Sequence, residues 1–204
     1  MLDDAASSPD VPQPAATRLT AASALTTRMV VEFFRLCNMV LIRYTWGEDC
    51  GVNTHTYSVE VEWSSPGGTA DYASYPREHR ISSAADATIS ASADPHFRGD
   101  PALWNPEQLL VAAAANCHML SYLALCALRG VTVIDYVDAA TGTMVETPGG
   151  GGRFTEIALA PRVTVAPGGD LDLALALHHD AGEQCYIAAS LTCPVTHTPV
   201  IAAG

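Results

Sequence analysis

One apolar stretch, residues 106–128, constrains the fold more than any other part of the sequence. Asn105 is a favourable N-cap, and Glu107 adds a negative charge at the positive end of the helix dipole. Arg129 and Gly130 supply a stop signal. Between these ends apolar residues occupy almost every face, which is typical of a helix buried on all sides. We therefore predict a central helix about 35 Å long.

The composition favours a compact, soluble protein. The chain has 204 residues, of which 49% are hydrophobic and 16% charged, with a net charge of −12. An acidic surface repels nucleic acid and anionic membranes, so neither is expected as a partner. No stretch reaches about 20 uninterrupted apolar residues, as a spanning helix would require. Asp3 and Asp4 stand where a secretory signal would carry positive charge. We therefore predict a cytoplasmic location.

The rest of the sequence predicts an α+β domain behind an N-terminal extension. Residues 1–53 are expected to be disordered or poorly ordered, although a short helix at 29–42 is conceivable. Residues 54–204 are expected to form one domain. Its predicted elements are a half-buried strand near 56–63, strands at 87–92, 131–136, 139–145 and 154–165, a second helix at 171–189, and a strand-like piece between Pro194 and Pro199. This order predicts two helices packed on antiparallel sheets.

The six cysteines carry no C-x-x-C pair, which disfavours a zinc ribbon or a disulfide scaffold. On the helix alone, Cys117 would most often be an inert buried thiol. A reactive Cys117 would need a cation from elsewhere in the chain, because a mid-helix position gains little from the dipole. Cys126 lies about 13 Å further along the helix, too far for a disulfide with Cys117. The other cysteines are Cys37 and Cys50, expected to be incidental, Cys185, and Cys193, expected to be buried but able to compete as a resolving thiol.

Five short motifs lie between residues 75 and 144. They are Tyr-x-Arg-x-His-x-Ile at 75–81, Ala-Asp-Pro-x-Phe-Arg-Gly-Asp at 93–100, Pro-Glu-Gln-Leu-Leu at 106–110, Asn-Cys-His-Met-Leu at 116–120, and Tyr-x-Asp-x-Ala-x-Gly-x-Met at 136–144. With Cys117 ten positions after Glu107, and Cys185 in the second helix, the chain resembles the OsmC-like branch of the OsmC/Ohr family of thiol-dependent peroxidases. The resemblance covers about residues 54–199.

This resemblance implies an intertwined homodimer with an OsmC-like fold and two active sites at the interface. It implies Cys117 as the peroxidatic cysteine, Cys185 as the resolving cysteine and Glu107 as the active-site glutamate. Arg77 is the expected thiolate-stabilising arginine, with Arg80 as second choice. The implied activity is reduction of organic hydroperoxides, and less well of hydrogen peroxide, through a Cys117 sulfenic acid and a Cys117–Cys185 disulfide. A lipoyl-type dithiol or small-molecule thiol would then reduce this disulfide, and the resemblance implies no metal or organic cofactor.

The helix geometry limits the role of Glu107. Ten positions correspond to about 15 Å along a helix axis, so the Glu107 carboxylate cannot touch the Cys117 sulfur. We expect Glu107 to act through an arginine or to serve a site of the partner chain.

Two other function classes remain open from the residues alone. One is a hydrolase that pairs Cys117 with His79 or His178, since a nucleophilic thiol also needs a base. His118 is not expected to be that base, because it projects about 100° away from Cys117. The other is a non-catalytic, small-molecule-binding dimer with unactivated thiols. A metal site at His178, His179 and Cys185 is disfavoured, because adjacent histidines on a helix diverge.

Overall fold

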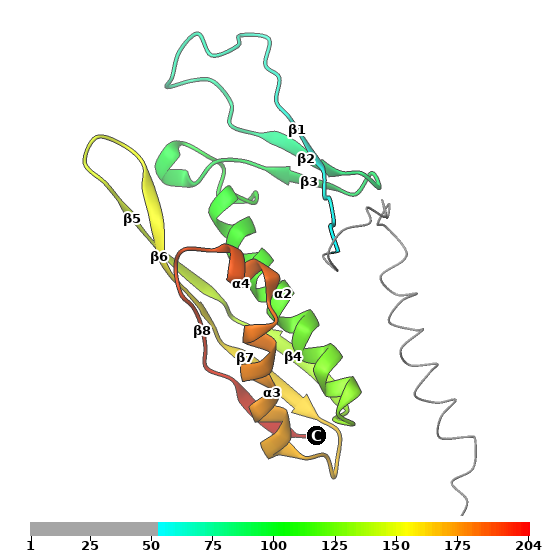
Figure 1. Ribbon diagram of the computed structural model, residues 1–204. Coiled ribbons are helices and arrows are strands. Elements are labelled where there is room, and N and C mark those ends of the chain that lie inside the picture. The colour runs from blue at the N-terminus through cyan, green and yellow to red at the C-terminus, as the bar shows by residue number, and fades with distance from the viewer. Residues whose placement is uncertain (1–52) are drawn as a thin grey trace, which may run out of the picture. The chain divides into compact units, whose positions relative to one another are not determined.

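The structure, a computed structural model, describes residues 53–204 of the chain (Figure 1). The helix considered at 29–42, Cys37, Cys50 and nearly all of the predicted extension lie outside the described residues. The chain divides into two compact units, residues 1–57 and 58–204. All helices and strands described below belong to the second unit.

Four helical segments and nine strands make up this unit, which confirms the predicted α+β class. The helical segments are η1 (Pro95–Phe97), α2 (Pro106–Leu128), α3 (Leu171–Glu183) and α4 (Tyr186–Ser190). The strands are β1 (Val59–Glu62), β2 (His79–Ser83), β3 (Thr88–Ala91), β4 (Val133–Asp138), β5 (Thr141–Glu146), β6 (Gly152–Leu159), β7 (Pro161–Val165), β8 (Val195–His197) and β9 (Val200–Ala203).

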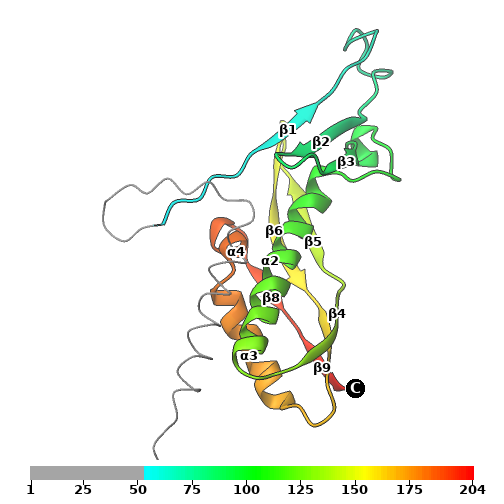
Figure 2. The same cartoon turned by 90° about the vertical axis from the view of Figure 1, so that its right-hand side faces the viewer.

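The strands form three three-stranded sheets, in the orders β1-β2-β3, β4-β7-β9 and β5-β6-β8. As predicted, antiparallel pairs dominate: β1–β2, β2–β3, β4–β7 and β5–β6. The short C-terminal strands β8 and β9 add parallel pairs, on β6 and β7 respectively. Figures 1 and 2 show α2 and α3 side by side on one face of the strands β4 to β9.

The long strand predicted at residues 154–165 is two strands in different sheets. Pro161 is the first residue of β7 and pairs with Asp138, a position that suits proline because it has no N–H to donate. The Ala160 amide leaves the ladder and donates to Asp138 Oδ1 at 2.8 Å. The proline therefore separates the two strands rather than bending one.

The start of α2 follows its sequence signals. Asn105 Oδ1 accepts a hydrogen bond from the Gln108 amide at 2.8 Å, and Gln108 Oε1 accepts one from the Asn105 amide at 3.2 Å. This reciprocal pair is a capping box. Beyond the other end, Gly130 has φ of +76°, which glycine tolerates without strain. The predicted helix and both of its ends are confirmed.

The burial of α2 differs from the expectation. Its fully buried residues, Ala114, His118, Tyr122 and Cys126, recur every four positions and so form one stripe. Leu120 and Leu128, by contrast, are 57% and 53% exposed. Burial on all sides is therefore wrong for a single chain. By length and composition α2 could also cross a membrane, but one such helix is weak evidence, because core helices of soluble proteins pass the same test.

Two clusters of buried apolar side chains hold α2 in place. One joins its C-terminal half to α3 and β7, and the other joins its N-terminal half to β6. Strand β1, predicted to be half-buried, is exposed along its whole length: Val59 is 70% and Val61 61% exposed. The alternation in β1 is correct, but no surface within residues 53–204 covers its apolar face.

Candidate active site

Cys117 in the middle of α2 and Cys185 just before α4 lie next to each other as free thiols. Cys185 is 2% exposed, whereas Cys117 is partly exposed. Burial raises the pKa of the Cys185 thiol above its ordinary value, and a hydrogen bond with Cys117 adds to this effect. The Ala188 amide donates to Cys185 Sγ at 3.4 Å and acts in the opposite direction. The two cysteines singled out in the sequence are thus brought together.

A break in the second helix positions Cys185. The single helix predicted at 171–189 is two helices, because α3 ends at Glu183 and the chain turns through Gln184. Cys185 then has an extended backbone and serves as the N-cap of α4. Both α3 and α4 pack on α2, so this turn faces the middle of the long helix.

Glu107 lies in the first turn of α2, away from the two thiols. It borders a cavity of about 760 Å³, which Trp104, Phe154 and Asp138 also line and Cys117 does not. Glu107 Oε2 is buried without a hydrogen-bond partner among residues 53–204. An unpaired buried carboxylate oxygen is costly, so this atom is suited to accept a donor from outside the described part of the chain.

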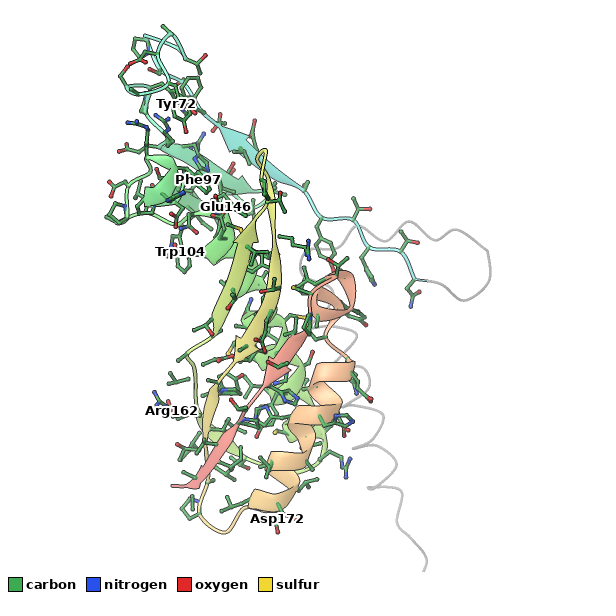
Figure 3. All side chains as sticks on the ribbon, turned by 90° about the vertical axis from the view of Figure 1, so that its left-hand side faces the viewer. Tyr72, Phe97, Trp104, Glu146, Arg162 and Asp172 are labelled. Atoms are coloured by element: carbon green, nitrogen blue, oxygen red, sulfur yellow. The ribbon has the colours of Figure 1, made fainter. Side chains whose placement is uncertain are left out.

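The two candidate arginines are engaged elsewhere. Arg77 Nη2 donates to the Tyr72 carbonyl at 2.7 Å, and its guanidinium lies 3.7 Å from the centre of the Tyr75 ring. Figure 3 shows Tyr72 in the β1–β2 loop and Asp172 at the opposite end of the domain. Arg80 forms an exposed ion pair with Glu62. Within the described residues, neither guanidinium contacts Cys117.

A buried histidine cluster near the thiols was not predicted. His118 Nε2 and His178 Nδ1 share a hydrogen bond of 3.0 Å, and both side chains are at most 2% exposed. Burial, followed by neighbouring histidines, lowers the pKa of His118 to about 4 and that of His178 to about 3. His197 Nε2 lies 2.9 Å from the His178 carbonyl oxygen. The signal available in the sequence was the spacing of His118 and Tyr122, which share the buried stripe of α2.

The geometry gives no support to a Cys/His pair at Cys117. His178 Nδ1 is bonded to His118, and His79 Nδ1 lies 2.9 Å from the Arg77 carbonyl oxygen in the β2 region. His179 is exposed and pairs with a glutamate of its own helix, so the expected divergence of His178 and His179 is confirmed. The described residues contain no group of three or more side chains arranged to hold a metal ion.

Comparison with known proteins gives one consistent family. Residues 99–199 match the family described as OsmC-like protein. An OsmC-like protein of unknown function from Vibrio cholerae is similar in structure, with 29% identity and a TM-score of 0.65 over 71% of this chain and 99% of that one. A search of curated proteins finds no significant match.

Two further solved structures share the fold at lower identity. An organic hydroperoxide resistance protein OsmC from Legionella pneumophila has 18% identity and a TM-score of 0.53, over 72% of this chain and 96% of that one. An OsmC-like protein from Mycoplasma pneumoniae has 13% identity and a TM-score of 0.57, over 72% and 97%. These two structures show the fold alone. The family match and the similarity to the Vibrio cholerae protein confirm the resemblance inferred from the motifs: residues 99–199 carry a domain of the OsmC-like protein family.

Proposed function

We propose that this protein is a cysteine-based peroxidase that reduces organic hydroperoxides, and hydrogen peroxide less well. The observation that carries the proposal is the contact between two free thiols, Cys117 in α2 and Cys185 at the N-cap of α4. A peroxidatic and a resolving cysteine must lie this close to form a disulfide. The hydroperoxide resistance named for the Legionella protein of the same fold supports this assignment.

The chemistry needs only these two thiols and a reductant. The Cys117 thiolate attacks the O–O bond, the alcohol leaves, and Cys117 becomes a sulfenic acid. The Cys185 thiol condenses with it, water leaves, and the Cys117–Cys185 disulfide forms. A lipoyl-type dithiol or a small-molecule thiol then returns both cysteines to thiols. Because burial raises its pKa, Cys185 is the weaker first nucleophile, which suits the resolving role.

We further propose an intertwined homodimer that completes each site. The apolar side chains of Leu120, Val59 and Val61 are all more than half exposed in one chain and would be covered by the partner. Arg77 of the partner subunit would supply the cation that Cys117 lacks among residues 53–204, with Arg80 of the partner subunit as second choice. Glu107 would accept from that guanidinium through its unpartnered oxygen and orient it. We also propose a cytoplasmic location, and the acidic net charge disfavours nucleic acid and anionic membranes as partners.

Peroxide consumption by the purified protein, with dithiothreitol as reductant, tests this function. Cys117→Ser should consume no organic hydroperoxide. Without the reductant, Cys185→Ser should consume one equivalent of hydroperoxide and retain a sulfenic acid that dimedone traps. Cys126→Ser is the matched control, because Cys126 packs in the core away from this pair and should leave turnover unchanged. Absence of both turnover and a Cys117–Cys185 disulfide in the unmutated protein would contradict the proposal.

One observation favours a second candidate, a non-catalytic small-molecule-binding dimer. The cavity of about 760 Å³ beside Glu107 is large enough for an organic ligand and has aromatic walls at Trp104 and Phe154. That function predicts ordinary alkylation rates for Cys117 at neutral pH and no change of those rates in Glu107→Gln. Fast alkylation of Cys117 that Cys185→Ser leaves intact would favour the peroxidase.

A further inference from the structure

A second, smaller cavity of about 280 Å³ adjoins the thiol pair on the side of Cys185. Cys185, His118 and His197 form part of its wall, whereas Cys117 does not line it. Cys185 therefore lies between Cys117 and this cavity. A small molecule in the cavity would meet the sulfur of Cys185 before that of Cys117.

The tautomer of His197 is fixed by the backbone. Its Nε2 lies 2.9 Å from the carbonyl oxygen of His178, and a carbonyl oxygen can only accept a hydrogen bond. Nε2 therefore carries the proton, and Nδ1 carries the lone pair. Within residues 53–204, Nδ1 has no hydrogen-bond partner and is not among the buried unpaired polar atoms. Its lone pair is free to accept a proton at the cavity.

His118, the other buried imidazole on this wall, is suited to a different role. Its Nε2 is occupied by His178, and its pKa is lowered to about 4, so it would take a proton from a thiol poorly. The His118–His178 pair instead holds the segment whose carbonyl anchors His197. His179 and Glu183 also line the cavity, but His179 is exposed and its Nε2 lies 3.5 Å from Glu183 Oε1 on the same helix. This leaves His197 as the half-buried imidazole with an available lone pair beside Cys185.

We propose that this cavity admits the dithiol reductant and that His197 is the general base that activates it. The inference rests on the proposed peroxidase function, because it concerns the step that resets the Cys117–Cys185 disulfide. It assigns a binding site to the reductant, a catalytic role to His197, and a direction to the exchange.

The exchange has two steps, which move two electrons from the dithiol to the protein. In the first, His197 Nδ1 takes the proton of one reductant thiol, the resulting thiolate attacks Cys185 Sγ, and Cys117 leaves as a thiolate. In the second, the other thiol of the reductant is deprotonated, and its thiolate attacks the reductant sulfur bound to Cys185. The cyclic disulfide departs, Cys185 takes the proton held by His197, and the second proton reaches Cys117 through solvent.

Leaving-group chemistry agrees with this direction. Thiol–disulfide exchange is faster when the departing thiol has a lower pKa. Attack at Cys117 would have to expel Cys185, whose pKa is raised by burial. Attack at Cys185 expels Cys117 instead. Cys117 is the more exposed residue, but a thiol held in this cavity borders Cys185. For a reductant in the cavity, position and leaving group therefore select the same sulfur.

The test begins with a disulfide made by diamide rather than by peroxide. Reduction by dithiothreitol is followed by acid quench and thiol counting in the unmutated protein and in His197→Gln. Glutamine keeps an N–H for the His178 carbonyl but has no basic nitrogen. We expect reduction to slow at least about tenfold at neutral pH, and the difference to shrink as pH rises and the reductant ionises unaided. His96→Gln, at an exposed histidine of η1, should match the unmutated protein.

A trapping experiment on the unmutated protein checks the direction without any substitution. The diamide-oxidised protein is mixed briefly with 2-mercaptoethanol, alkylated and digested, and the mixed disulfide is located by mass spectrometry. An adduct on Cys185 is expected, and one on Cys117 would overturn the inference. Equal reduction rates in His197→Gln, or failure of diamide to join Cys117 to Cys185, would also overturn it. Peroxide is absent throughout, so loss of peroxide turnover alone counts only against the proposed function.

Discussion

His118 Nε2 lies 3.0 Å from His178 Nδ1, and both imidazoles are buried between α2 and α3. Burial lowers both pKa values far below the usual 6.5, to about 4 and about 3. Below pH 6.5 these two histidines therefore bind protons in the unfolded chain but stay neutral in the folded chain. The stability of the folded state is fully present above pH 6.5 and declines as the pH falls toward 4.

This predicts a loss of roughly 2 kcal/mol of unfolding free energy per imidazole between pH 7 and pH 5. Urea unfolding at fixed protein concentration measures it. His96→Gln, which removes an exposed imidazole, should leave the pH dependence unchanged. A free energy of unfolding that is flat from pH 7 to pH 5 would contradict the neutral, buried pair.

A second prediction concerns the start of α2. Asn105 is 5% exposed; its Oδ1 accepts from the Gln108 amide and its Nδ2 donates to Asp94 Oδ2 at 3.3 Å. Asn105→Ala removes the capping acceptor and should lower the free energy of unfolding by about 1 to 2 kcal/mol. Asn105→Ser keeps an acceptor at the cap and should lose less. If urea unfolding shows the same loss for both variants, the cap is not what stabilises this helix end.

The features predicted correctly from the sequence have local causes. Helix α2 is marked in the sequence by Asn105, a run of helix-compatible residues and Gly130. Each of these signals acts within a few positions of the chain. The proximity of Cys117 and Cys185, by contrast, was expected only from the family resemblance, since no local pattern connects two cysteines so far apart in the sequence. The active-site role of Glu107 also comes from that resemblance and stays a prediction. Its cavity is built from the loop before α2 and strands β5 and β6.

The features that were missed depend on contacts between distant segments. His118 and His178 meet only because α2 and α3 pack together. The parallel pairing of β8 with β6 joins segments almost forty residues apart, and no turn signal marks it. The prediction that α2 is buried on all sides was wrong for one chain. An apolar sequence indicates which side chains are favourably buried, but it does not indicate whether the same chain or another molecule covers them. The exposed Leu120 is the clearest case.

Leu120 provides a third prediction. It is 57% exposed in the middle of α2, where the proposed homodimer would bury it. Leu120→Glu should convert a dimer of about twice the 21.4 kDa chain mass into a monomer and abolish peroxide turnover, because a buried unpaired charge is strongly unfavourable. Light scattering after gel filtration measures the mass. Leu175→Glu, at a leucine of α3 that is 47% exposed, is the matched control and should remain dimeric. A Leu120→Glu protein that stays dimeric and active would exclude α2 from the interface.

The last prediction concerns Glu107 and Arg77 as one unit. If Glu107 Oε2 orients Arg77 of the partner subunit, Glu107→Gln and Arg77→Lys should each lower kcat/KM for an organic hydroperoxide by about tenfold or more. Lysine keeps the charge but loses the planar pair of donors that a carboxylate can accept. The double variant should then lose little more than either single one, because the two changes remove the same interaction.

Glu146→Gln is the control for this cycle, since Glu146 is exposed and pairs only loosely, at 3.6 Å, with His96. It should leave kcat/KM unchanged. Losses that simply add in the double variant would show that Glu107 and Arg77 act independently. In that event the same cycle with Arg80→Lys, the second-choice arginine, would decide whether another guanidinium reaches the unpartnered oxygen of Glu107. Non-additivity with Arg80 alone would move the active-site arginine to that position and free Arg77 for its stacking on Tyr75.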